Sequence, residues 1–301
     1  MSAMLSFTDV QVRFTSDDAV QPTPAVGGVS LDIQRGEIFG IVGESGSGKS
    51  TLANAVMGLL PGSAALHGSI RVAGREVIGL SENEFRAIRG NEVSMIFQDA
   101  SASLDPVWSV GDQVAETIRA HAGVSGREAK NRAIALMTEV GIPDAASRYR
   151  DVPHRFSGGM RQRIVIAAAL ANSPQLLIAD EPTTALDVTI QAQVLQLIGT
   201  LRQQHGTTVL LITHDLGVVA QICDRVGVMY GGTLLEVAAT AELFAHPQHP
   251  YTRALLAANP AGAPRGHRLP VIPAQWSVES LGAAELQRAS AAPMETAGAD
   301  E

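Results

Sequence analysis

One segment of eight residues constrains the fold of this chain more than any other. It reads Gly-Glu-Ser-Gly-Ser-Gly-Lys-Ser from Gly43 to Ser50, and it follows the continuous apolar run 38–42. The pattern G-x-x-x-x-G-K-[ST], placed between a buried strand and a helix, is typical of a phosphate-binding loop. Glycines let backbone N–H groups turn inward, and the helix start adds partial positive charge. The segment predicts an ATP site on an α/β fold.

The side chains of this loop have distinct expected roles. Lys49 can reach the β- and γ-phosphates, and the Ser50 hydroxyl can ligate Mg²⁺. The alternatives are a glycine-rich turn with a solvated lysine, or a dinucleotide loop, whose G-x-G-x-x-G spacing the glycines do not fit. The chain has only two lysines, so Lys49 does not belong to a lysine-rich surface. The residues expected to contact the nucleotide are Gly43, Glu44, Ser45, Gly46, Ser47, Gly48, Lys49, Ser50 and Thr51.

The apolar pattern indicates the fold class. Runs 176–179 and 209–212 are continuously apolar, as in parallel strands that are covered on both faces, and the helical pattern 190–204 lies between them. This alternation predicts an α/β core with a parallel sheet. The pattern is helical from about 110 to 140 and stops at Gly141, so we expect an inserted helical subdomain over about 99–163. Clear strand signals end after residue 232.

A pair of carboxylates ends the first of these two apolar runs. Asp180 and Glu181 follow the run 176–179, and a buried unpaired charge is costly, so a cation is expected nearby. Asp180 suits a Mg²⁺ ligand, and Glu181 could polarise an attacking water. His214 follows the strand that ends at Thr213 and could hydrogen-bond the γ-phosphate. Taken singly, these residues could be a solvated strand end and a structural histidine.

Composition excludes several classes of protein. The 301 residues carry a net charge of −8, which gives no general attraction to nucleic acid, so no nucleic acid partner is expected. The one cysteine, Cys223, excludes an internal disulfide and suits a reducing cytosol. The first ten residues lack the basic region of a signal peptide, and no apolar run approaches the ~20 residues of a membrane helix.

A second glycine-containing motif gives the chain a family resemblance. Residues 157–162 read Ser-Gly-Gly-Met-Arg-Gln, which resembles the signature motif of ATP-binding cassette (ABC) ATPases. A flexible turn is the alternative for this motif alone. The resemblance covers about residues 5–235, with its motifs in family order. It implies a P-loop NTPase fold, the ABC nucleotide-binding domain, in which the signature of one subunit closes over the phosphate loop of another. The residues expected at the partner's ATP are Ser157, Gly158 and Gly159.

Four further residues match family positions. Gln98 resembles the Q-loop glutamine, at the joint between the core and the helical subdomain, and His214 resembles the switch histidine. Asp187, in Ala185-Leu186-Asp187, resembles the D-loop aspartate that contacts the opposing subunit. Phe14 resembles the aromatic residue that stacks on adenine, but it shares a strand face with Val10 and could equally be core. Taken alone, Gln98 could be a surface residue and Asp187 a helix N-cap.

Two stretches resemble the peptide and nickel importers within this family. Residues 98–106 resemble their Q-D-P-x-x-S-L-N-P segment, with Ala100 and Asp105 departing from it, and residues 246–253, His-Pro-Gln-His-Pro-Tyr-Thr-Arg, resemble their C-terminal element. We therefore expect an ABC ATPase domain over 1–235, a short C-terminal extension over 236–273, and a disordered tail over 274–301. No cysteine follows Cys223, so the iron–sulfur cluster of some relatives is not expected.

The resemblance implies a function. It predicts an ATP- and Mg²⁺-dependent ATPase that energises import of dipeptides or oligopeptides, with Lys49, Gln98, Glu181 and His214 as catalytic residues and Ser50, Gln98 and Asp180 at the metal. The implied partners are a second, related ABC subunit, two membrane-spanning permease subunits and, indirectly, an extracytoplasmic solute-binding protein. The implied location is the cytoplasmic face of a prokaryotic inner membrane. The alternative is a soluble ABC ATPase without a transport role.

Overall fold

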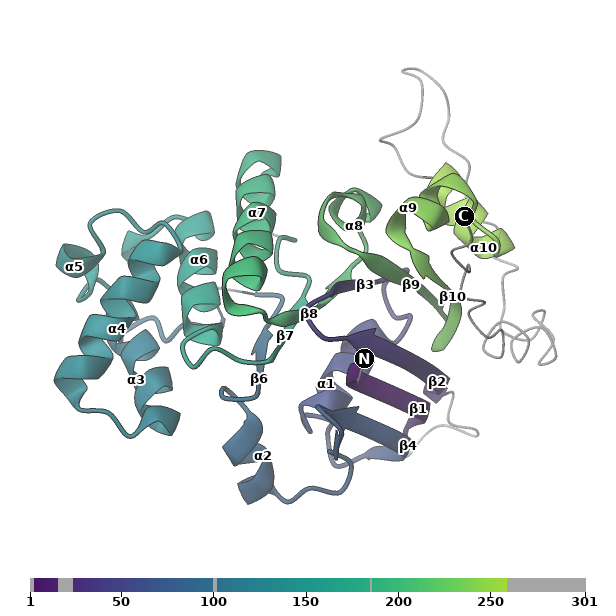
Figure 1. Cartoon of the computed structure of the whole chain (residues 1–301), viewed down its shortest axis with the longest axis horizontal. Coiled ribbons are helices and arrows are strands. Elements are labelled where there is room, and N and C mark those ends of the chain that lie inside the picture. The colour runs from purple at the N-terminus through teal and green to yellow at the C-terminus, as the bar shows by residue number, and fades with distance from the viewer. Residues whose placement is uncertain (1–2, 16–23, 100–101, 185, 259–301) are drawn as a thin grey trace, which may run out of the picture.

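The chain folds into two β-sheets and a set of helices (Figure 1). The computed structural model describes residues 3–15, 24–99, 102–184 and 186–258. The larger sheet has six strands in the order β10-β9-β3-β8-β7-β6. Its strands are β3 (Ile38–Val42), β6 (Val93–Ile96), β7 (Leu176–Asp180), β8 (Thr208–Thr213), β9 (Arg225–Tyr230) and β10 (Thr233–Ala239).

The larger sheet is parallel except for β10, which pairs with β9 in the antiparallel direction. The carboxyl ends of its parallel strands therefore meet at one edge, where ligands bind in open α/β sheets. Every residue of β3, β7 and β8 is buried, because both faces of these strands are covered. The strands predicted from the continuous apolar runs are confirmed.

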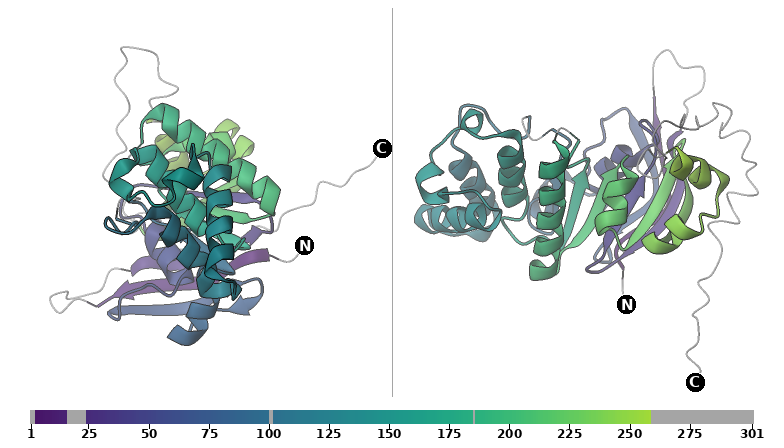
Figure 2. Two further views of the ribbon diagram at one scale, coloured as in Figure 1. Left: turned by 90° about the vertical axis from the view of Figure 1, so that its left-hand side faces the viewer. Right: turned by 90° about the horizontal axis from the view of Figure 1, so that it is seen from above.

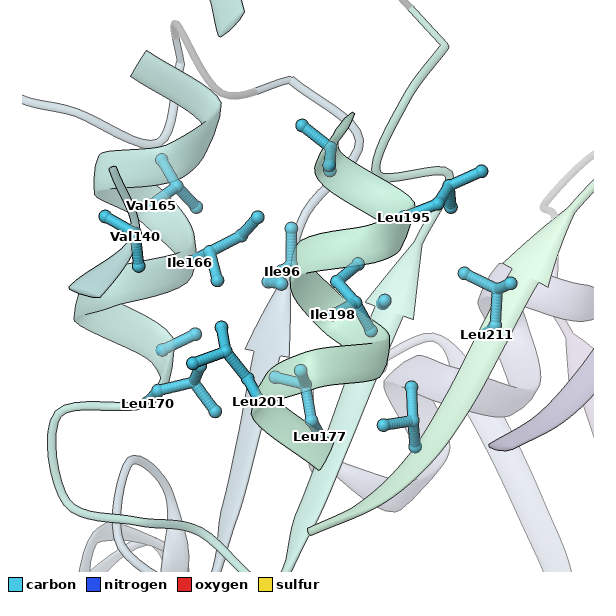
Figure 3. Close-up of a cluster of buried hydrophobic side chains, with 14 of the residues drawn as sticks. Ile96, Val140, Val165, Ile166, Leu170, Leu177, Leu195, Ile198, Leu201 and Leu211 are labelled. Carbon is cyan, nitrogen blue, oxygen red and sulfur yellow. The ribbon is translucent and has the colours of Figure 1, made fainter. Parts of the chain in front are cut away.

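Side chains from the larger sheet alternate between two cores. Leu177 and Leu211 belong to the core on the helical side, whereas Ile178 and Ile212 belong to the core on the opposite side. Figure 3 shows Leu177 and Leu211 on the side of the sheet that faces Ile198 of α7 (Val188–His205). The opposite core is closed by a four-stranded antiparallel sheet in the order β2-β1-β4-β5. Its strands are β1 (Ala3–Phe14), β2 (Pro24–Gln34), β4 (Ala64–Val72) and β5 (Arg75–Glu76).

A short helix joins the two sheets at the phosphate loop. Helix α1 (Lys49–Val56) follows β3 and packs against β2 and β4 of one sheet and β7 of the other. It ends at Val56, two residues before Gly58, which takes a positive φ of 61°. Helix α2 (Glu82–Ile88) precedes β6 and begins with a capping box at Ser81.

Helices that follow β6 gather at one end of the molecule, and the C-terminal helices lie at the other (Figures 1 and 2). The first group comprises α3 (Val110–Ala122), α4 (Gly126–Glu139), α5 (Ala145–Arg148), a short 3-10 helix (Pro153–Arg155) and α6 (Gly158–Ala169). One helical stretch was expected from 110 to 140, but Gly123 ends α3 in the left-handed conformation and Ser125 caps α4. Position 163, the expected end of the inserted subdomain, falls inside α6.

The C-terminal part extends the larger sheet. Position 235, the expected end of the ATPase domain, falls inside β10, so the expectation that strands end by residue 232 is wrong. Helices α8 (Leu216–Ile222), α9 (Thr240–Ala245) and α10 (Pro250–Ala257) complete this part. The expected tail 274–301 lies outside the described residues. In the part of the chain that is described, no helix has the length and apolar character needed to cross a bilayer.

Candidate functional site

The phosphate loop runs from the carboxyl end of β3 into α1, and two of its glycines are sterically required. A Cβ on Gly43 would lie 2.1 Å from the carbonyl oxygen of Met229, and one on Gly48 would lie 2.3 Å from that of Ala25. Gly48 also has a φ of 97°, which L side chains rarely adopt. Gly48 is the N-cap of α1 and has no side chain to cap it, so the first N–H groups of α1 remain for a ligand.

Lys49 lies across the loop and is almost fully buried, with 5% of its surface exposed. Its ammonium group donates to the carbonyl oxygens of Gly43, at 2.8 Å, and Glu44, at 2.7 Å, and to the hydroxyl of Ser47 at 3.2 Å. Burial lowers the pKa of Lys49, and the nearby carboxylates of Glu181 and Asp180 oppose that shift. The ammonium is therefore a desolvated cation inside the loop, where attraction to an anion is strong.

Ser50 and Asp180 join the loop to the neighbouring strand. The Ser50 hydroxyl donates to a carboxylate oxygen of Asp180 at 3.0 Å. Burial raises the pKa of Asp180, and the Glu181 charge adds to this, whereas Ser50 and Lys49 act in the opposite direction. A hydroxyl and a buried carboxylate side by side are oxygen ligands of the kind that Mg²⁺ prefers. Among the described residues, no group of three His, Cys, Asp or Glu side chains forms an all-protein metal site.

Asp180 should make the ligand-free fold less stable, because its charge is buried. Its raised pKa means that the folded state binds a proton more tightly than the unfolded state, so at neutral pH the ionised form costs stability. We expect Asp180→Asn to raise the melting temperature of the ligand-free protein by about 2 °C, and to abolish the stabilisation that Mg²⁺ with ATP gives. Thermal denaturation with and without both ligands measures this. A lower melting temperature for the ligand-free variant would contradict it.

Glu181 sits in a strained backbone conformation at the centre of a hydrogen-bonded group. Its φ is 47°, which is uncommon for a residue with a side chain, and its N–H donates to the carbonyl of Ile212 at 2.8 Å. Gln98 donates to one carboxylate oxygen at 3.0 Å, Thr184 donates to the same oxygen at 2.8 Å, and His214 Nδ1 lies 3.1 Å from the other. The carboxylate is thus fixed at the edge of the sheet beside the phosphate loop.

The environment of Glu181 keeps it ionised. Burial would raise its pKa, but the hydrogen bonds from His214 and Thr184, together with the charge on Lys49, outweigh burial and leave the pKa below its usual value. Glu181 is 16% exposed at its side chain, whereas His214 is 56% exposed. An oriented carboxylate with one side open to solvent can bind and polarise a water molecule.

The structure therefore brings most of the predicted catalytic residues together. The carboxylates of Asp180 and Glu181 both interact electrostatically with the Lys49 ammonium. Glu181 contacts both Gln98 and His214. Sequence reasoning missed Thr184, which lies in the turn after β7 and carries no motif of its own. Gln98 was expected to act in catalysis and at Mg²⁺, and here its side-chain N–H donates to Glu181, a contact that the sequence did not predict.

The signature residues form a separate region at the start of α6. The Ser157 hydroxyl accepts from the N–H of Met160 at 3.3 Å and so caps the helix. No hydrogen bond between described residues joins Ser157 to the phosphate loop. Gly158 is exposed, and a Cβ there would meet only Leu186, at 3.9 Å. Gly159 is buried, and a Cβ there would lie 2.4 Å from Ile190 of α7, so packing alone requires this glycine.

Asp187 and Phe14 have local structural roles in this single chain. Asp187 is the N-cap of α7, with its carboxylate accepting from the N–H of Ile190 at 3.0 Å. The preceding Ala185 lies outside the described residues. Phe14 ends β1, where it pairs with Ala64, and it is partly buried against the core between the two sheets. Contact with a partner subunit or with adenine stays a prediction for these two residues.

Comparisons with known proteins agree with this geometry. Residues 26–184 match a family described as "ABC transporter". "Probable peptide ABC transporter ATP-binding protein y4tR" of Sinorhizobium fredii is 50% identical over 273 residues, which cover 90% of this chain and 81% of that protein. "Dipeptide transport ATP-binding protein DppD" of Bacillus subtilis is 48% identical over 262 residues, which cover 86% and 78%.

A solved structure has the same fold. The dimeric structure of a post-hydrolysis state of the ATP-binding cassette MJ0796, bound to ADP and Pi, matches with a TM-score of 0.70 and 28% identity. The match covers 79% of this chain and 99% of that chain. The strand order and the phosphate loop described above therefore belong to a fold that is known to hold a nucleotide.

Proposed function

Because the chain belongs to the ABC transporter family and is an ATPase of that family, we propose that its ATP hydrolysis drives a membrane importer of dipeptides or oligopeptides. The observation that supports this most is the group around Glu181. Gln98, Thr184 and His214 fix its carboxylate beside a phosphate loop whose Lys49 is buried and charged. The cargo class rests on the relatives, whose names refer to peptides and dipeptides.

The residues of the phosphate loop would bind and orient ATP. The N–H groups of the loop and of the first turn of α1 would cradle the phosphates, and Lys49 would move from its loop carbonyls to the β- and γ-phosphates. Ser50 and Asp180, with the carbonyl oxygen of Gln98, would hold Mg²⁺, which neutralises developing charge on the phosphates. Glu181 would orient the attacking water, and His214 would hold Glu181 in place and approach the γ-phosphate.

The active site is proposed to be shared between two ATPase subunits. The solved relative is a dimer, and here Ser157 and Gly158 are exposed at the N-terminus of α6 and, among the described residues, form no hydrogen bond with the phosphate loop. They would close over the ATP of a second, related chain. Asp187 would contact that chain beside the same ATP.

The two signature glycines give this proposal a matched test. Gly158→Ala adds a methyl group in open space, so we expect a stable chain that still binds ATP, while ATPase activity of the assembled pair falls at least tenfold. Gly159→Ala forces a clash with Ile190 and should destabilise the fold by about 1–3 kcal/mol. Urea denaturation and steady-state phosphate release separate the two effects. Normal activity of the Gly158→Ala pair would contradict the shared site.

An exposed apolar stretch beside Gln98 is proposed to contact the permease. Phe97 is 45% exposed, Trp108 43% and Val107 85%, and all three lie between β6 and α3. Large exposed apolar side chains of this kind mark interaction surfaces. Since Phe97 adjoins Gln98, which bonds to Glu181, movement at the nucleotide could pass directly to this surface. The chain would then be peripheral, on the cytoplasmic face of a prokaryotic inner membrane.

The proposed assembly also includes two membrane-spanning subunits and, indirectly, an extracytoplasmic solute-binding protein. Nucleic acid is not among the proposed partners, and the net charge of −8 supports this. The comparisons lend no support to a soluble ABC ATPase without a transport role. Nor do we propose an iron–sulfur cluster, because no cysteine follows Cys223 in this sequence.

Peptide uptake by cells tests the proposal. A strain that lacks this chain should import a radiolabelled tripeptide at a strongly reduced rate. The wild-type chain should restore uptake, and the Glu181→Gln chain, expressed at the same level, should not. Peptide uptake that is equal in the presence and absence of the chain would contradict the importer assignment.

A further inference from the structure

One arginine of the helical subdomain packs against the chain next to the signature residues 157–159. Arg148 is the last residue of the short helix α5, and 23% of its side chain is exposed. Its guanidinium lies over the ring of Phe156, with the central carbon 3.9 Å from the ring centroid. Phe156 is buried and immediately precedes Ser157. The guanidinium is therefore stacked on the residue from which the signature begins.

The same guanidinium makes polar contacts on both sides of the signature. Its Nη2 donates to the backbone carbonyl of Arg155 at 2.9 Å, and its Nη1 donates to the sulfur of Met160 at 3.8 Å. The first contact is an ordinary hydrogen bond, and the second is weaker because a thioether sulfur is a weak acceptor. One side chain thus contacts two residues that precede the signature and the residue that follows it.

Met160 connects this arginine to the side chain of Ser157. The N–H of Met160 donates to the Ser157 hydroxyl at 3.3 Å, which caps α6. Ser157 and Gly158 are exposed, whereas Gly159 packs against α7. The positions of the two exposed residues therefore depend on the neighbouring residues, which Arg148 and α7 hold. A shift of Met160 would move the hydroxyl that is expected to reach the partner's ATP.

Arg148 is itself held in place by the segment that follows it. Its Nε donates to a carboxylate oxygen of Asp151 at 3.3 Å. The carbonyl of Asp151 accepts from the N–H of Val110 at 2.9 Å, and that of Tyr149 accepts from the N–H of Gly111 at 3.0 Å. These backbone bonds attach the segment to the first turn of α3. The guanidinium therefore contacts the signature from a fixed position, so little conformational entropy is lost when the signature binds.

We propose that Arg148 is a positioning residue for the signature, which it holds in the conformation that presents Ser157 and Gly158 to the ATP of a second chain. The proposal rests on the proposed sharing of the active site between two subunits. The planar guanidinium is required, because it can stack on a ring while its edge donates hydrogen bonds. Arg148 would act without touching the nucleotide, since a misplacement of about 1 Å can slow a reaction by up to 100-fold.

Arg148→Met tests the proposal, because it keeps an apolar stem and removes every contact of the guanidinium. The signature would serve the other chain's ATP, so the purified full-length variant should bind ATP with wild-type affinity. Steady-state phosphate release by the assembled pair of ATPase subunits at saturating ATP should fall about tenfold. Both measurements are made well below the melting temperature of the variant, so lower stability alone changes neither. A wild-type rate in the Arg148→Met pair would overturn the proposal.

Two further arginine variants provide matched controls. Arg148→Lys keeps the positive charge beside Asp151 but lacks the planar fork, so its pair should also release phosphate severalfold more slowly than wild type. Arg155→Met removes a side chain that is 66% exposed and bonds to the same Asp151 at 3.5 Å, and it leaves the backbone carbonyl in place, so its pair should be fully active. Equal losses in Arg148→Met and Arg155→Met would overturn the proposal. If Arg148→Met does not fold, Arg148→Lys decides, and a wild-type rate in its pair would overturn the proposal.

A double-mutant cycle with Gly158→Ala separates positioning of the signature from a general structural role. If Arg148 acts through the signature, adding Arg148→Met to Gly158→Ala should lower the rate by less than about twofold more, because effects within one unit are not additive. Two effects that simply multiply would overturn the proposal. A wild-type rate in the Gly158→Ala pair would instead refute the shared site, so the two failures are distinguishable.

Discussion

Replacing Glu181 with Gln is expected to stop ATP turnover while leaving ATP binding intact. Glutamine has the same shape and can still accept hydrogen bonds from Gln98 and Thr184, so the fold around the strained backbone should persist. It has no negative charge with which to polarise water. Loss of a positioned base typically costs 10²- to 10⁴-fold in rate, and we expect the fall to be about 10²-fold or more.

The decisive comparison for Glu181 is binding against turnover on the same preparation. Equilibrium binding of ATP should stay within a few-fold of wild type, and phosphate release should drop to background. Thr184→Val is an informative companion, because it removes one hydrogen bond to the carboxylate and should lower the rate less severely. Turnover by Glu181→Gln at the wild-type rate would remove Glu181 from its proposed role.

Lys49→Ala is expected to abolish nucleotide binding. The ammonium is buried and makes three hydrogen bonds within the loop, so the loop holds this side chain in place, unlike a flexible lysine on the surface. Two charge-assisted bonds to phosphates are together worth about 3 kcal/mol or more, which corresponds to at least roughly 100-fold in affinity. The variant also leaves the carbonyls of Gly43 and Glu44 without this donor, so the loop itself should be less ordered.

A control separates the lysine's role in binding from its role in the fold. Lys130→Ala removes the only other lysine of the chain, whose ammonium lies over the ring of Tyr149 at 5.0 Å. It should bind ATP normally. ATP affinity that is unchanged in Lys49→Ala would refute the assignment of the phosphate loop, whatever the stability of the variant.

The central strands could be predicted from the sequence because a strand that is buried on both faces consists of consecutive apolar residues. Strands β3, β7 and β8 are continuous apolar runs, and their limits differ from the predicted ones by no more than a residue at either end. Strand β10 was missed because most of its residues are only partly buried, so the apolar pattern is weak. The break between α3 and α4 was missed because the apolar spacing continues across a short exposed turn at Gly123.

The residues of the candidate site that belong to a sequence motif could be predicted. Residues that the folded structure alone brings to the site could not. Lys49, Ser50, Asp180 and Glu181 follow from the loop motif and from charges at a strand end. Thr184 carries no such pattern, because its hydrogen bond to Glu181 depends on the conformation of the turn that follows β7. In the single chain, Asp187 is a helix N-cap, the alternative that the sequence also allows.

Phosphate release from ATP by the purified chain tests the central claim most directly. With Mg²⁺ present, the wild-type chain should release phosphate above the background set by a Lys49→Ala preparation made in the same way. Chelation of Mg²⁺ should bring the wild-type rate down to that background. A wild-type rate equal to that of Lys49→Ala, in a chain shown to be folded by thermal denaturation, would contradict the account.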